Sequence, residues 1–104
     1  MSNKVQITPE ERKVISKILQ DLLPSNSHVW VFGSRAKGPI KPFSDLDFAI
    51  DIGQPLSLDL LADLRFAFDE SSLPYQVDIV DLNTISPNFL HIIDSHKIPF
   101  LLSS

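Results

Sequence analysis

Apolar residues recur at helical spacing directly after a helix-start signal near the beginning of the chain. Thr8 can cap the helix, Pro9 suits its first position, and Glu11 stands three residues after the cap. The apolar residues that follow fall three and four positions apart and share one face: Val14, Ile15, Ile18, Leu19, Leu22 and Leu23. Because Pro24 comes next, the pattern predicts a helix over about residues 9–23.

Further along, short apolar runs alternate with segments of helical period. Runs rich in β-branched and aromatic residues predict strands at 28–32, 45–52 and 76–82. Helices are expected at 57–70, with Ser57 as a cap, and at 83–96, while residues 35–44 form a short helical turn and a loop and 97–102 close the chain. The last helix is expected to be built on Phe89, Leu90, Ile92 and Ile93. This order predicts an α/β (α+β) fold, in which helices cover one small mixed β-sheet.

Length and composition limit the classes of protein to consider. With 104 residues, the chain has room for a single domain spanning 1–104. Its 43% hydrophobic and 21% charged residues are typical of a folded globular protein. No apolar run is long enough for a membrane span, the first residues are too polar for a secretory signal, and cysteine is absent, so we expect a cytoplasmic protein.

The charge of the chain changes this picture in two ways. A net charge of −4 makes a broad grip on a nucleic-acid backbone unfavourable, because such binding needs many cationic contacts to phosphate. Several aspartates lie in or beside strand-like runs, where β-propensity disfavours them: Asp45, Asp47, Asp51, Asp78 and Asp81. Their placement therefore needs an explanation.

The strand at 45–52 separates apolar and acidic side chains onto opposite faces. Leu46, Phe48, Ile50 and Ile52 should point one way, and Asp45, Asp47, Ala49 and Asp51 the other. Asp45 and Asp47 then raise each other's electrostatic cost unless a cation lies between them, and Asp78 on the next strand supplies a third carboxylate. Oxygen ligands without histidine or cysteine suit Mg²⁺, or Mn²⁺. Two such ions, about 3.5–4 Å apart, support in-line displacement at phosphorus, so the pattern predicts phosphoryl or nucleotidyl transfer.

A phosphate-binding turn is expected where the strand at 28–32 ends. Gly33 and Ser34 stand at the start of a helical turn, where backbone N–H groups and the helix dipole favour an anion. The missing side chain of Gly33 permits close backbone approach, and Ser34 adds a hydroxyl donor. Arg35 and Lys37 can neutralise the β and γ phosphates, or they can belong to an ordinary solvated loop.

These residues together resemble a known family. The segment GSRAKGPIKPFSDLDFAI, with a third carboxylate in QVDIVDL, is similar to the nucleotidyltransferase fold of the polymerase-beta superfamily, and the chain length resembles its minimal (MNT) branch. The resemblance covers roughly residues 28–82. It implies that Asp45 and Asp47 bind the catalytic metals, that Asp78 completes one metal site and helps to activate the acceptor hydroxyl, and that Gly33 and Ser34 grip phosphate.

The remaining polar residues have simpler interpretations. Asp51 and Asp81 are expected to be strand-end or solvated aspartates, and the histidines His28, His91 and His96 to have surface or structural roles. Tyr75 and Trp30 are expected to pack. The apolar ending from Ile98 to Leu102 either finishes the core or meets a partner chain.

An Asp-x-Asp pair also occurs in haloacid-dehalogenase-type phosphotransferases, but there it follows an apolar strand, whereas here it precedes the run FAI. This order disfavours that class of enzyme.

The sequence therefore favours an enzyme that moves AMP from ATP, or another NTP, to a hydroxyl acceptor. The resemblance implies a partner, a small helical HEPN-type toxin encoded nearby, which such a domain neutralises as an antitoxin by adenylylating a tyrosine or by plain binding. Two alternatives stay open: a binding antitoxin without catalysis, and a nucleotidyltransferase for a small molecule or for RNA. The base preference is also open, and so is the oligomeric state, whether homo-oligomer or hetero-oligomer.

Overall fold

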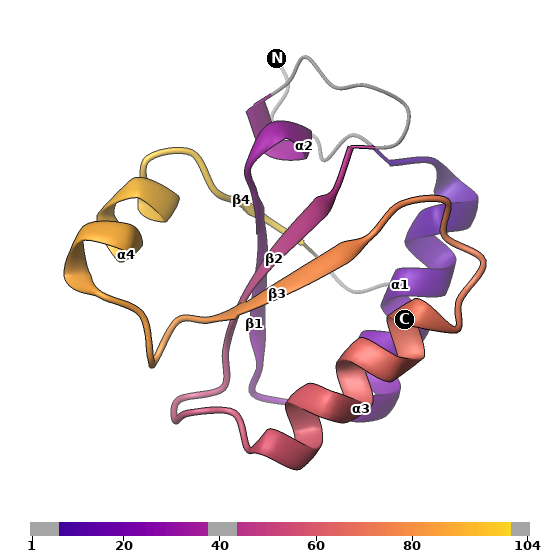
Figure 1. The fold of residues 1–104 in the computed structure, drawn as a ribbon, viewed down its shortest axis with the longest axis horizontal. Helices are drawn as coiled ribbons and strands as arrows, with labels where there is room; N and C mark the ends of the chain where they lie inside the picture. The colour runs from indigo at the N-terminus through magenta and orange to yellow at the C-terminus, as the bar shows by residue number, and fades with distance from the viewer. Residues whose placement is uncertain (1–6, 38–43, 101–104) are drawn as a thin grey trace.

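A four-stranded sheet forms the centre of the molecule (Figure 1). The structure, a computed structural model, describes residues 7–37 and 44–100. Its elements in chain order are α1 (Pro9–Leu22), β1 (His28–Phe32), α2 (Ser34–Lys37), β2 (Leu46–Asp51), α3 (Leu58–Asp69), β3 (Val77–Asp81), α4 (Pro87–Asp94) and β4 (Ile98–Pro99). The α/β class and the mixed sheet predicted from the sequence are confirmed.

The sheet has the strand order β3-β2-β1-β4. β1 pairs antiparallel with β2 and β4, and β2 pairs parallel with β3. The sequence analysis missed β4, which is only two residues long and contains Pro99. Because proline cannot donate to a strand ladder, it is tolerated at a sheet edge and gives no strand signal.

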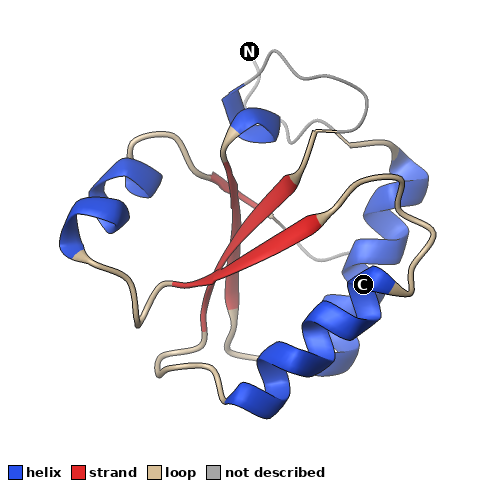
Figure 2. Ribbon diagram, in the orientation of Figure 1, coloured by secondary structure: helices blue, strands red, loops and turns tan. Residues whose placement is uncertain are grey.

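The two long helices, α1 and α3, cover one face of the sheet, and α4 lies on the opposite side (Figure 2). The predicted alternation in β2 is confirmed on the covered face, where Leu46, Phe48 and Ile50 are fully buried. They pack in one core with α1 and α3, represented by Ile15, Leu19 and Leu64. Ala49, predicted on the acidic face, is also fully buried, so that face is covered along part of its length.

The first helix begins as its sequence signal predicts. The Glu11 amide donates to the Thr8 hydroxyl, and the Thr8 amide donates to Glu11 Oε1, each at 3.1 Å. Two amides at the helix start are thereby satisfied. Leu23 leaves the helix in an extended conformation, as expected for a residue before proline.

The last helix is shorter than the predicted range of 83–96. Residues after β3 first make a turn, in which the Thr84 amide donates to the Asp81 carbonyl at 3.1 Å. The helix then starts at Pro87, and the Phe89 amide donates to the Ser86 hydroxyl that caps it. Proline fits the first helical position but not a helix interior, which explains the later start.

The apolar residues of α4 are less buried than predicted. Ile93 is fully buried, whereas Phe89 is 37% and Ile92 57% exposed. The chain end shows the reverse, because Ile98 and Phe100 are buried in the core, and the Phe100 amide donates to the Val29 carbonyl. They finish the core and do not form a partner surface. The rest of the predicted apolar ending, Leu101 and Leu102, lies outside the described residues.

Within the described ranges, no helix combines the length and apolarity needed to cross a membrane.

Candidate functional site

The predicted carboxylates lie at the sheet edge where β1 ends and where β2 and β3 begin. Asp47 pairs with Phe32 on one side and with Asp78 on the other. Directly paired residues on neighbouring strands project from the same face, so Asp47 and Asp78 point together. Their side chains are within hydrogen-bond reach of each other. The structure therefore brings together two aspartates that are 31 residues apart in the sequence.

Asp47 is the most perturbed carboxyl group of this site. Burial raises its pKa to about 6, and the negative charges of Asp78 and Asp45 add to the effect. When protonated, Asp47 shares a hydrogen bond with Asp78, which raises its pKa further. The mutual electrostatic cost predicted from the sequence is thus present, and the site would gain from a cation.

Divalent metal binding can be tested on the donor chemistry of these residues. The site offers carboxylate oxygens, which are the ligands that Mg²⁺ and Mn²⁺ prefer. Asp45 is exposed and stands just before β2, and within the described part of the chain no three acidic or histidine side chains are gathered closely enough to hold a metal. The paired Asp47 and Asp78 fit a hard cation in chemistry and charge. The ligand roles of Asp45, Asp47 and Asp78 stay predictions.

Gly33 follows β1 and lies against Asp47. Its φ of +77° is in the left-handed region that side chains rarely adopt. A Cβ atom at this position would overlap Asp47 Oδ2. The sequence analysis explained this glycine by the approach of phosphate, and the structure adds a second reason, which is the room that the Asp47 carboxylate needs.

His96 contacts the same turn from the other end of the chain. The Gly33 amide donates to His96 Nε2 at 2.8 Å, and His96 Nδ1 lies 3.3 Å from the Ser95 hydroxyl. Because Nε2 accepts, the ring proton of the neutral form is on Nδ1. A surface or structural role was expected for His96, but its partner was not, since no spacing of histidines in the sequence predicts a contact across 63 residues. The Gly33 amide is therefore already satisfied.

The side chain of Arg35 is buried, whereas the sequence predicted either a phosphate contact or an ordinary solvated loop. Its side chain is 3% exposed, its Nε donates to the Ser44 carbonyl at 3.0 Å, and its guanidinium lies 3.9 Å from the centre of the Tyr75 ring. Ser34 and Lys37 have their backbone in α2, and their side chains lie outside the described part of the structure. Their phosphate roles stay predictions.

Asp51 and Asp81 organise loops, as expected, at the opposite end of β2 and β3. Asp51 Oδ1 accepts from the Asn83 side chain at 2.9 Å and from the Gly53 amide at 2.8 Å. These bonds, with that of Asn83 first, hold the pKa of Asp51 below its usual value. Asp81 Oδ2 accepts from the Leu56 amide at 2.7 Å. Both carboxylates are used by the fold and are separate from the Asp47–Asp78 pair.

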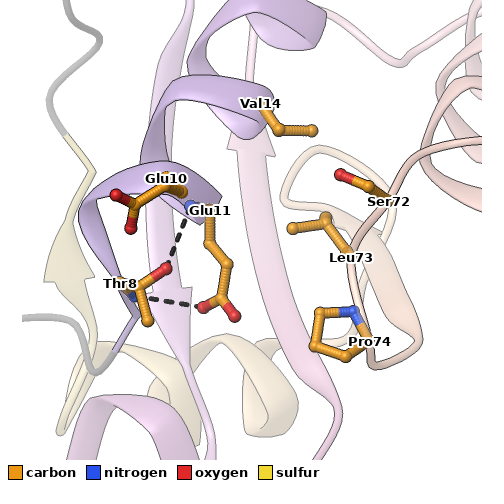
Figure 3. Close-up of a pocket in the computed structure, with 7 residues that line it drawn as sticks. All are labelled: Thr8, Glu10, Glu11, Val14, Ser72, Leu73 and Pro74. Carbon is orange, nitrogen blue, oxygen red and sulfur yellow. Dashed lines mark hydrogen bonds between the residues drawn. The ribbon is translucent and has the colours of Figure 1, made fainter.

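A pocket of about 310 Å³ lies between the start of α1 and the loop before β3 (Figure 3). It is lined by Thr8, Glu10, Glu11, Val14, Ser72, Leu73 and Pro74, and none of the predicted site residues is among them. The carboxylate of Glu11 is engaged by the Thr8 amide and by the Tyr75 hydroxyl. The pocket therefore lies beside Tyr75, which Glu11 contacts, and apart from the predicted site residues.

Known proteins resemble the chain in sequence and in fold. Residues 13–102 match the family described as polymerase beta, nucleotidyltransferase. The chain is 44% identical over 90 residues to "Probable protein adenylyltransferase MntA" of Haemophilus influenzae, which covers 86% of this chain and 78% of that protein.

Two solved complexes contain chains with the same fold. One is a crystal structure of a toxin-antitoxin with AMP-PNP, in which the matching chain is 25% identical with a TM-score of 0.73, covering 89% of this chain and 74% of its own. The other is a tri-AMPylated Shewanella oneidensis HEPN toxin in complex with an MNT antitoxin, 22% identical with a TM-score of 0.67, covering 90% of this chain and 71% of its own. The strand and helix arrangement described above is therefore one that solved proteins share.

Proposed function

This chain belongs to the polymerase beta nucleotidyltransferase family and is a nucleotidyltransferase, and we propose that it is an antitoxin that transfers AMP from ATP to a tyrosine hydroxyl of a HEPN-type toxin. The observation that carries the proposal is the pairing of Asp47 with Asp78 directly beside the Gly33 turn. A carboxylate pair next to a phosphate-binding turn suits displacement at phosphorus.

Each residue of the site has a proposed task. Asp47 and Asp78, with Asp45 just before β2, would hold Mg²⁺, which when bound neutralises charge and polarises the attacked phosphoryl group. Asp78 is exposed, so it can face the acceptor and take the proton of the hydroxyl. The new bond joins the acceptor oxygen to the α phosphorus, the bond from that phosphorus to the bridging oxygen breaks, and pyrophosphate leaves.

The triphosphate would lie along the start of α2. Because the Gly33 amide donates to His96, the phosphate donors are taken to be the Ser34 hydroxyl and the amides that follow Gly33. Lys37 is the proposed cation for the outer phosphates, since the Arg35 guanidinium is buried on Tyr75. In this arrangement the backbone amides would orient the triphosphate, and the Lys37 ammonium would neutralise part of its charge.

The acceptor is proposed from relatives and from charge. The MntA relative carries the name of a protein adenylyltransferase, and the Shewanella complex pairs an MNT antitoxin with an AMPylated HEPN toxin. The net charge of −4 also disfavours a polyanionic acceptor. A binding antitoxin without catalysis would have no use for two adjacent carboxylates, of which one has its pKa raised by burial and by the charge of its neighbours.

One reaction mixture distinguishes the acceptor classes. The chain is incubated with α-labelled ATP, Mg²⁺, total tRNA and a HEPN-type protein encoded nearby, and the products are separated both before and after nuclease treatment. We expect label on the HEPN protein. Label on tRNA alone would overturn the proposal, and so would suppression of the toxin without transfer of label.

A further inference from the structure

Arg35 lies where three segments of the site converge. Its Nε donates to the Ser44 carbonyl at 3.0 Å, which joins the two ends of the spacer between the Gly-Ser and Asp-x-Asp sequences. Its guanidinium rests on the Tyr75 ring, 3.9 Å from the ring centre. With 3% exposure for Arg35 and 9% for Tyr75, both contacts are shielded from water. An arginine in this setting is held by the fold on several sides.

Tyr75 is itself fixed from the far side. Its hydroxyl donates to Glu11 Oε1 at 3.0 Å, and the same oxygen accepts the Thr8 amide at the start of α1. Burial, followed by the Glu11 contacts, raises the pKa of Tyr75, so the hydroxyl stays protonated and remains a donor. The contacts therefore run without a break from α1 through Tyr75 and Arg35 to the start of β2.

The chain positions of these residues show what they support. Arg35 stands two residues after Gly33, Ser44 directly precedes Asp45, and Tyr75 stands three residues before Asp78. We infer that Arg35 is a positioning residue, which with Tyr75 sets the phosphate-binding turn and the two carboxylate-bearing strands in register with one another. The inference deepens the proposed function and rests on it for its catalytic consequence.

The chemistry of the site calls for arginine in particular. A planar guanidinium can stack on an aromatic ring and donate sideways from Nε at the same time, whereas a lysine ammonium is a point charge on a flexible stem. Arg35→Lys therefore keeps the charge but loses both the stacked plane and the Nε donor. A direct phosphate contact would survive this replacement in part, and the positioning role would not.

Two backbone hydrogen bonds provide a readout that needs no nucleotide. The Leu46 amide donates to the Gln76 carbonyl at 2.9 Å at the supported end of β2 and β3, and the Leu82 amide donates to the Ile50 carbonyl at 3.0 Å at the other end. Amide hydrogen exchange of the full chain reports the opening of each bond. Arg35→Lys should speed exchange at Leu46 by about tenfold or more and at Leu82 by less than about twofold.

The matched control is Arg65→Lys on the exposed surface of α3, which should change neither rate. Tyr75→Phe keeps the ring beneath Arg35 and removes only the bond to Glu11, so it should speed Leu46 exchange less than Arg35→Lys does. Equal acceleration at Leu46 and Leu82, or none at either, would overturn the positioning role.

Kinetics separate the positioning role from a phosphate contact. With Mg²⁺ and ATP, Arg35→Lys should lower kcat by about tenfold or more, while the Kd for ATP measured by calorimetry changes by less than about threefold. Weaker ATP binding with kcat unchanged would overturn the inference and favour a direct contact. If the wild-type chain transfers no AMP, the proposed function fails, and the exchange measurement still decides the structural part of the inference.

Discussion

The Asp47 carboxylate lies against Gly33, in the space that a side chain at position 33 would occupy. A Cβ atom on Gly33 would overlap Asp47 Oδ2. This relationship brings the turn after β1, where phosphate binding is predicted, next to the Asp47 carboxylate. It also brings one residue of the glycine-serine pair against one residue of the Asp-x-Asp pair, although ten residues separate the two pairs in the chain.

Replacing Gly33 by alanine should therefore damage the site beyond its cost in stability. Gly53 is the matched control, because its φ is +85° but an added Cβ would meet nothing within 4 Å. Both Gly→Ala variants should lose about 1–2 kcal/mol of unfolding free energy for the left-handed backbone. AMP transfer should fall by more than about tenfold in Gly33→Ala only. Equal activity in the two variants would contradict the contact with Asp47.

The raised pKa of Asp47 predicts a pH-dependent stability in the absence of divalent ions. Its folded-state pKa is about 6, above the ordinary value of 3.8, so the folded state binds the proton more tightly than the unfolded state. The stability that this group contributes is fully present below about pH 4 and is lost as pH rises through about 6.

The variant Asp47→Asn should consequently unfold at higher urea concentration than wild type at about pH 8, and this advantage should vanish near pH 4. Added Mg²⁺ should stabilise the wild type at about pH 8 and leave the variant unchanged. The control Asp63→Asn, on the exposed surface of α3, should show no such crossover. A constant difference between wild type and Asp47→Asn at both pH values would contradict the pKa assignment.

His96 should support nucleotide handling through the Gly33 turn. His96→Ala removes the acceptor 2.8 Å from the Gly33 amide, a bond worth about 0.5–1.5 kcal/mol. We expect kcat/KM for ATP to fall about threefold to tenfold. The exposed His91 of α4 serves as the control, and His91→Ala should leave kcat/KM unchanged. Identical values for the two variants would show that the Gly33 amide needs no acceptor from His96.

Phe100, near the end of the chain, should behave as a core residue. Phe100→Ala should lower the unfolding free energy by about 3–5 kcal/mol, because its side chain is 3% exposed and packs on Phe48. Phe66, 67% exposed on α3, is the matched comparison, and its replacement by alanine should cost less than about 0.5 kcal/mol. Urea unfolding of both variants measures the difference. A small loss for Phe100→Ala would restore this end of the chain as a candidate partner surface.

Local patterns were sufficient to predict most of the fold. The capping box at Thr8 and Glu11, the strand at 28–32 and the apolar face of β2 all follow from spacing and side-chain type, and the structure confirms them. Pro87 also marks a helix start that the predicted range 83–96 overlooked, although its position in the sequence could have shown it.

Contacts between distant parts of the chain could not be predicted in the same way. The bond from Gly33 to His96 and the stacking of Arg35 on Tyr75 depend on how the elements pack, and no residue spacing encodes them. Charge alone suggested that Arg35 either contacts phosphate or lies in a solvated loop; its burial contradicts the solvated loop, and the phosphate contact stays a prediction. The pairing of Asp47 with Asp78 was predictable in type, because both stand near the starts of strands, but its register came only from the sheet.

We propose that Asp47 and Asp78 support the transfer of AMP to a tyrosine of a HEPN-type partner. The most direct test is the intact mass of that partner after incubation with ATP, Mg²⁺ and either wild-type chain or Asp47→Asn, followed by peptide mapping of the modified residue. We expect one or more added AMP groups on tyrosine with the wild type and none with Asp47→Asn, while the variant stays folded and still binds the partner. An unmodified partner with the wild type, or equal modification with Asp47→Asn, would contradict it.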